Sequence, residues 1–195
     1  MLRMHGNELR KAGRGGAAIA RLTEAAELSR NGQERGQTLI LLARAAGEQG
    51  NAVLLDDSVT AAERLMDTAG PSGILFAPFS LREVHMRGLM GIGRAAMAAG
   101  LAQSRPGSGE APAPQWAAIE AVTSADTLSA AGDLCSAHAL YDKALSLAVR
   151  HRLPHQVQRV VRSAGTVGLE EIQAEAIARL RDLGQHRTPA DSLTI

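Results

Sequence analysis

The sequence has few aromatic residues, only two lysines and a single cysteine. Phe76, Phe79, Trp116 and Tyr141 are its aromatic residues, whereas 36 of the 195 residues are alanine. Small apolar side chains favour closely packed helices over a sheet core. Because Cys135 is the sole cysteine, an internal disulfide and a multi-cysteine zinc site are excluded, which fits a reducing compartment.

The sequence also lacks a long hydrophobic run and a strong net charge. Its 21 basic and 20 acidic residues give a formal charge of +1, which excludes a global field for nucleic acid. The longest apolar stretches, such as residues 39–43, fall far short of the roughly 20 residues of a membrane span. Residues 1–16 lack the apolar core of a secretory signal. We therefore expect a soluble, cytoplasmic protein.

Apolar residues recur at three- and four-residue steps along most of the sequence, which is the spacing of one helical face. No segment shows sustained two-residue alternation, so we predict an all-α fold without strands. The predicted helices span residues 16–31, 33–49, 56–68, 80–103, 115–131, 133–151, 154–163 and 169–183.

One segment breaks the helical pattern. Residues 104–114, SRPGSGEAPAP, contain three prolines, two glycines and two serines without apolar periodicity, which is typical of a linker or long loop. The sequence therefore divides into a flexible N-terminus (1–16), a first helical-repeat part (17–103), the linker (104–114), a second helical-repeat part (115–184) and a flexible tail (185–195).

A pattern of glycine and small residues recurs at the turns between predicted helices. Ala137, Tyr141 and Ala144 follow Gly132 at five, nine and twelve residues, as in the second helix of the 34-residue tetratricopeptide repeat. A two-helix hairpin cannot bury its apolar face alone, so small residues set the helix spacing where hairpins stack. The predicted repeat-packing residues are Gly13, Ala18, Leu22, Ala25, Gly50, Val59, Ala62, Gly132, Ala137, Tyr141 and Ala144.

The spacing of these turn glycines is irregular. It is 37 residues from Gly13 to Gly50 and 82 residues from Gly50 to Gly132. We expect the longer interval to hold two degenerate units across residues 76–100 and the linker. The predicted architecture is thus a short array of tetratricopeptide-like antiparallel helical hairpins.

The sequence as a whole resembles the helical-repeat sensor region that follows an Xre-type helix-turn-helix domain in actinobacterial transcription regulators. The stretch ALYDKALSLAVRHRLPHQVQRVVRSAG, residues 139–165, carries most of this resemblance. The resemblance implies binding of a peptide, protein or small effector and transmission of that state to a DNA-binding domain. Residues 1–16 are too short for such a domain, so we expect a freestanding relic, a fragment of a regulator or an adaptor that acts alone.

A basic stretch near the C-terminus is the strongest local charge feature, because no acidic residue lies between Asp142 and Glu170. It is either a surface for nucleic acid or an acidic partner, or a solvated helix face that caps the preceding helix and balances the glutamates after it. The predicted partner or nucleic-acid binding residues are Arg150, Arg152, His155, Gln156, Arg159 and Arg162.

Other motifs do not indicate a metal, a cofactor or catalysis. His151 and His155 have the spacing of a helical metal site, but Pro154 separates them and no acidic ligand is near in sequence. Residues 91–96, GIGRAA, match a loose dinucleotide pattern without the strand that it requires. No nucleophile or pair of carboxylates converges by spacing, so we predict no metal, no cofactor and no enzyme activity.

The three aromatic residues Phe76, Phe79 and Trp116 lie near the middle of the sequence. They either line an effector pocket or fill an irregular junction in the repeat stacking. We favour the second interpretation.

We therefore predict a non-enzymatic, effector-sensing module that binds a protein or peptide, in transcriptional regulation or signalling. The alternative is a regulator that binds DNA directly through residues 150–162.

Overall fold

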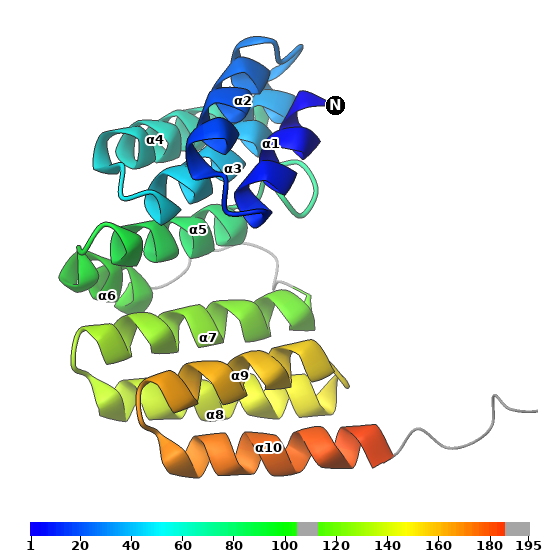
Figure 1. Ribbon diagram of the computed structural model, residues 1–195, viewed down its shortest axis with the longest axis vertical. Coiled ribbons are helices and arrows are strands. Elements are labelled where there is room, and N and C mark those ends of the chain that lie inside the picture. Colours follow the sequence, from blue (N-terminus) through cyan, green and yellow to red (C-terminus); the bar gives the residue numbers. More distant parts are fainter. Residues whose placement is uncertain (105–112, 186–195) are drawn as a thin grey trace, which may run out of the picture. The chain divides into compact units, whose positions relative to one another are not determined.

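The computed structural model describes residues 1–104 and 113–185, and helices account for most of them. Contacts divide the chain into two compact units, residues 1–109 and 110–195, which we describe separately. Successive helices pack as antiparallel pairs in each unit (Figure 1), and the described residues contain no strand beyond one isolated bridge between Ser72 and Phe76. The all-α prediction is confirmed. None of the helices in these two ranges is both long and apolar enough to cross a membrane.

Unit 1 consists of three helical pairs. The long third helix is central, because it packs against the first, second, fourth and fifth helices. Its buried side chains Leu39, Ile40 and Leu42 form the core together with side chains such as Val59 and Phe76. The helices are α1 (Leu2–Lys11), α2 (Gly15–Glu27), α3 (Gly32–Glu48), α4 (Ala52–Ala69), α5 (Pro78–Gly91) and α6 (Ala95–Gln103).

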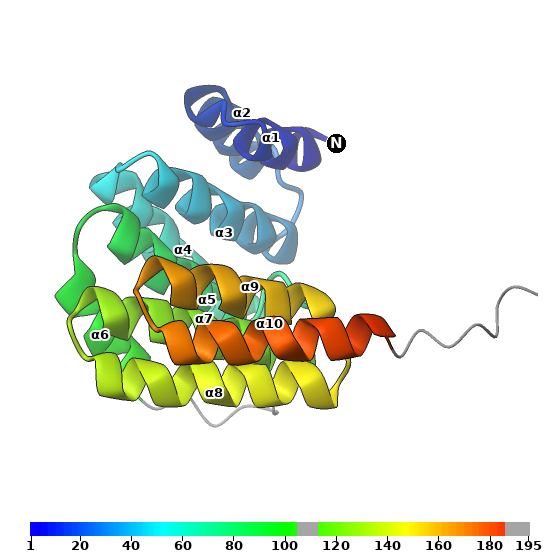
Figure 2. The same cartoon turned by 60° about the horizontal axis from the view of Figure 1, so that its bottom comes forward.

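Unit 2 consists of two helical pairs, α7 (Pro114–Ala130) with α8 (Leu134–Arg150) and α9 (Pro154–Thr166) with α10 (Glu170–Gln185). Helix α9 contacts the other three, which Figure 2 shows from a second side. Val122, Tyr141, Val157 and Val160 are completely buried, so the core of this unit lies where α7, α8 and α9 meet.

A glycine with positive φ closes the turn inside each of the five pairs. At the first turn, the N–H of Gly13 donates to Arg10 O at 3.0 Å and the N–H of Arg14 donates to Leu9 O at 2.9 Å. This is the Schellman arrangement, which satisfies the last carbonyls of a helix and requires a left-handed residue. The five glycines, with φ between 70° and 87°, are Gly13, Gly50, Gly93, Gly132 and Gly168.

These turns correct the predicted repeat spacing. Gly93 divides the 82-residue interval from Gly50 to Gly132 into 43 and 39 residues. One helical pair, α5 with α6, therefore lies there in place of the two degenerate units that we expect. The same glycine divides the helix that we predict over residues 80–103 into α5 and α6. The apolar periodicity continues across the break, which is why the pattern alone does not reveal it.

The first residues also differ from the prediction, since residues 2–11 form helix α1 where we expect a flexible N-terminus. Gly6 allows a close approach to α2, because a Cβ there would lie 2.7 Å from Leu22 Cγ. Arg10 Nη1 donates to Glu48 Oε1 of α3 at 2.6 Å. These tertiary contacts stabilise a helix whose own composition is polar.

Helix α4 begins four residues before its predicted start at 56. The side chain of Asn51 caps it by accepting a hydrogen bond from the N–H of Leu54 at 3.1 Å. An asparagine at this position satisfies one of the free N–H groups of the first turn.

Glycines allow α3 and α5 to cross at backbone contact. A Cβ added to Gly47 would lie 2.5 Å from Gly88 Cα, and one added to Gly91 would overlap Gly47 O. Gly88 itself leaves room for Leu55, whose Cδ1 would lie 2.6 Å from an added Cβ. Glycines in the GIGRAA region therefore serve helix packing and the turn at Gly93, and no strand precedes them in the described residues.

Candidate functional site

The predicted repeat-packing residues other than the glycines lie on the inner face of the second helix of a pair, namely α2, α4 or α8. Each non-glycine member is at most 8% exposed, and the glycines occupy the turns described above. The offset of five, nine and twelve residues from Gly132 leads to three completely buried side chains, Ala137, Tyr141 and Ala144. These residues are therefore part of the core and are not accessible to a ligand.

Tyr141 also makes the main polar contact of this core. Its hydroxyl donates to Asp126 Oδ1 of α7 at 2.7 Å. Burial raises the pKa of Tyr141, and the charge of Asp126 and this hydrogen bond raise it further, whereas the nearby hydroxyls of Ser129 and Ser163 act in the opposite direction. The hydroxyl is thus held as a neutral donor that joins α8 to α7.

The first helices of unit 1, α1, α3 and α5, carry a set of polar side chains that contact one another. Arg3 Nη1 donates to Gln37 Oε1, and Arg10 bridges to Glu48. Both contacts join α1 to α3. We define the first-helix face as the side chains of Arg3, Asn7, Arg10, Gln37, Arg44, Glu48, Glu83 and Arg87.

Helix α5 contributes an ion pair to this face, in which Arg87 Nε lies 2.5 Å from Glu83 Oε1. The Glu83 side chain is only 8% exposed. Arg44 of α3 lies within the field of this pair, since Glu83 raises its pKa and Arg87 lowers it. Desolvation is the largest effect and lowers the pKa of Arg44.

The first-helix face thus combines charge of both signs with partial exposure. The side chains of Arg44, Arg87 and Glu48 are 33%, 34% and 44% exposed. Guanidinium groups present several donors in a fixed plane, and carboxylates present acceptors. Such a surface can bind polar and charged groups of an extended partner across three helices, but it offers no nucleophile with an activating base.

The predicted basic residues of unit 2 lie at and after the end of α8. Arg150, His155 and Arg162 are exposed, and no acidic residue lies among them in sequence. Arg159 is partly buried and its Nη2 donates to Thr123 Oγ1 of α7 at 2.6 Å. Arg159 therefore joins two first helices.

Arg152 and Gln156 have other positions. Arg152 is the left-handed residue of the α8–α9 turn, with φ 52°, and it takes the place that glycine holds within the pairs. The Oε1 atom of Gln156 is buried without a hydrogen-bond partner among the described residues. The structure thus leaves four of the six predicted residues exposed, Arg150, Arg152, His155 and Arg162. Arg152 also forms the turn, and Arg159 joins α9 to α7.

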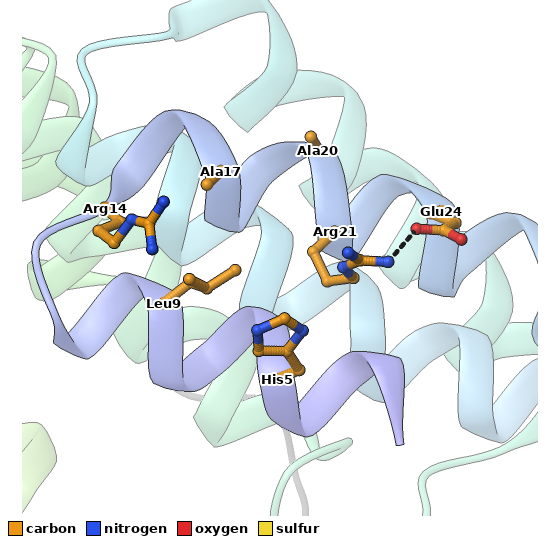
Figure 3. Close-up of a pocket in the computed structure, with 7 residues that line it drawn as sticks. All are labelled: His5, Leu9, Arg14, Ala17, Ala20, Arg21 and Glu24. Atoms are coloured by element: carbon orange, nitrogen blue, oxygen red, sulfur yellow. Dashed lines mark hydrogen bonds and ion pairs between the residues drawn. The ribbon is translucent and has the colours of Figure 1, made fainter.

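A surface groove of about 360 Å³ lies between α1 and α2 (Figure 3). Leu9 and two alanines form its apolar lining, and Arg14, Arg21 and His5 surround it. Arg21 is paired with Glu24 at 2.8 Å. The groove is lined by short or exposed side chains and lacks a buried polar group that would orient a ligand.

The two histidines with metal-site spacing lie on different helices, because His151 caps the end of α8 and His155 follows Pro154 at the start of α9. Across residues 1–104 and 113–185, no group of three or more His, Cys, Asp or Glu side chains could hold a metal.

The predicted aromatic group is distributed over both units. Phe76 is completely buried, and its ring occupies the space where a Cβ of Gly36 would lie. Phe79 of α5 and Trp116 of α7 are partly exposed. Phe76, in the segment between α4 and α5, therefore packs against α3.

Sequence reasoning missed the first-helix face. Gln37, Arg44 and Glu48 follow one another at seven and four residues on α3. Polar residues at this spacing lie on one helical face. That pattern was available from the sequence, but the partners of these residues on α1 and α5 depend on tertiary packing.

Comparison with known proteins supports the fold. No protein-family model matches the sequence, and no curated protein matches it significantly. The structure is similar to a crystal structure of a Rap protein complexed with competence and sporulation factor, with a TM-score of 0.64 and 13% sequence identity. The match covers 94% of this chain and 53% of that chain, so the chain spans about half the length of the Rap protein. The predicted tetratricopeptide-like architecture is confirmed as a fold.

Proposed function

We propose that this protein is a non-enzymatic helical-repeat module that binds a peptide or an extended protein segment and passes the bound state to a partner in transcriptional regulation or signalling. The observation that carries the proposal is the first-helix face, where three successive first helices present partly exposed charges of both signs. Stacked helical repeats use such extended surfaces for binding.

The fold comparison supports the same proposal. The Rap protein with this architecture was crystallised with competence and sporulation factor, so this arrangement of helices is compatible with recognition of a regulatory factor. The sensor role that we infer from the sequence resemblance would couple such binding to a DNA-binding partner.

A direct test is a screen of the full chain against an array of random eight-residue synthetic peptides, followed by fluorescence anisotropy on the best binders. We expect saturable binding that weakens when Glu48 is changed to Gln or Arg87 is changed to Gln. Uniformly weak binding to every peptide would contradict the proposal.

Direct DNA binding is a second candidate, because Arg150, His155 and Arg162 are exposed. Phosphate contacts make binding strongly salt-dependent. Retention of a fluorescent DNA duplex at low salt, lost at moderate salt and in an Arg150→Gln, Arg162→Gln variant, would support this function. Absence of retention at low salt would exclude it.

A further inference from the structure

Five charged side chains on the first-helix face of unit 1 form a cluster with one more guanidinium than carboxylates. Arg10, Arg44 and Arg87 come from α1, α3 and α5, and Glu48 and Glu83 accompany them. Arg44 is the centre of the cluster, because each of the other four charges acts on it.

Both carboxylates already have closer partners than Arg44. Glu48 Oε1 lies 2.6 Å from Arg10 Nη1 but 3.8 Å from Arg44 Nε. Glu83 Oε1 lies 2.5 Å from Arg87 Nε. Arg44 therefore has long-range attraction to these groups without a short ion pair.

Arg44 is also poorly satisfied for its degree of burial. Its side chain is two-thirds removed from solvent, with 33% exposure, and Nε is buried without a hydrogen-bond partner in the described part of the chain. A buried guanidinium N–H without a hydrogen bond is unfavourable. The exposed third of the side chain is the part that a ligand can reach.

We propose that Arg44 binds a carboxylate of the partner peptide on the first-helix face, with Arg10 and Arg87 adjacent. This inference rests on the proposed function and specifies the chemistry of its ligand. A carboxylate supplies the anion that the cluster lacks, and its two oxygens match the fork of donors of a guanidinium. The carboxylate is either an Asp or Glu side chain or the C-terminus of the peptide.

The experiment compares matched peptides from the array. Each binding peptide is synthesised with its acidic residues intact or changed to the corresponding amides, and with a free or an amidated C-terminus. Fluorescence anisotropy then measures the dissociation constants with wild-type protein and with Arg44→Gln, Arg44→Lys and Arg35→Gln. Arg35 is the matched control, because it is exposed on the same helix, nine residues away and thus on the opposite face.

We expect neutralisation of one carboxylate source to weaken wild-type binding about 10- to 100-fold, as for a charge-assisted hydrogen bond. Arg44→Gln should cause a similar loss and should no longer distinguish the carboxylate peptide from its amide. Arg44→Lys should retain part of the preference through charge alone, and Arg35→Gln should bind as wild type does. The peptide form that loses affinity identifies the source of the carboxylate.

Peptide binding that is equally strong in wild type and Arg44→Gln, with the same preference for carboxylate, would overturn this inference and leave the proposed function intact. Absence of binding to every peptide would overturn both. Arg44→Gln removes a charge near Glu83 and could therefore affect folding, so thermal unfolding of each variant separates a loss of folding from a loss of binding. An Arg44→Gln protein that unfolds like wild type and still prefers the carboxylate peptide to its amide contradicts the proposal.

Discussion

The crossing of α3 and α5 predicts opposite outcomes for the same substitution at two glycines. Gly47→Ala places a Cβ 2.5 Å from Gly88 Cα, which is backbone and cannot rotate away. Gly100 lies in α6 with nothing within 4 Å of an added Cβ. Helix propensity alone favours alanine over glycine by about 1 kcal/mol at either position.

At Gly47 the overlap dominates. Separating two packed helices costs about 1–3 kcal/mol or more for one added methyl group in a close-packed core, and the gain in propensity offsets only part of this. We expect a net destabilisation of about 1–2 kcal/mol for Gly47→Ala and a stabilisation of up to about 1 kcal/mol for Gly100→Ala.

Thermal unfolding followed by circular dichroism measures both changes. A change of 1 kcal/mol shifts the Tm of a protein of 195 residues by about 2–4 °C. The two variants should therefore move apart by roughly 4 °C or more. A Gly47→Ala protein as stable as wild type or more stable would refute the backbone contact between α3 and α5, and Gly100→Ala controls for the intrinsic effect of alanine.

Two further predictions concern unit 2. Gly132→Ala, at φ 87°, should destabilise the protein by about 1–2 kcal/mol, whereas Arg152→Gly, at φ 52°, should stabilise it by up to about 1 kcal/mol. The reason is that only glycine adopts the left-handed backbone conformation without steric cost. Chemical denaturation measures both changes, and equal effects of the two substitutions would contradict the left-handed conformation of these two residues. Tyr141→Phe should cost about 1–2 kcal/mol at neutral pH, since the hydrogen bond from Tyr141 to Asp126 is lost. The folded-state pKa of Tyr141 is raised, so its contribution is fully present below the unfolded value of about 10 and is lost as pH rises above it. Stability measured from neutral to alkaline pH should therefore fall more steeply for wild type than for Tyr141→Phe, and ultraviolet titration of this sole tyrosine should place its ionisation above the ordinary value; parallel pH profiles would argue against a buried neutral hydroxyl.

The parts of the fold that were predictable depend on local signals. The turn glycine at 132 and the buried residues after it follow a short fixed pattern, and the helix ends at Gly50 and Gly70 follow from backbone chemistry. Helix α1 was not predictable in this way, because its stability comes from the close contact of Gly6 with Leu22 and from the bridge between Arg10 and Glu48. Such contacts join residues that are 16 and 38 positions apart, beyond the range of a periodicity argument.

The candidate site was less predictable than the fold, and the reason is physical. A run of basic residues is conspicuous in sequence, yet Arg159 forms a contact with Thr123 and Arg152 occupies a turn. The charges of the first-helix face, four arginines and two glutamates, are dispersed over three helices. Their significance depends on which arginine is left without a close carboxylate, and only the distances around Glu48 and Glu83 decide that.

Under the proposed function, packing and recognition depend on different sets of side chains in this protein. The glycine, alanine and tyrosine pattern lies on the second helices and fixes the spacing of the hairpins. The charges of the first-helix face lie on α1, α3 and α5 and are distinct from these buried residues. Because the proposed ligand chemistry depends on exposed side chains and the fold on buried ones, two proteins can share this fold at 13% identity and still bind different partners. The identity of the partner therefore has to be sought in residues such as Arg44, and the repeat pattern cannot supply it.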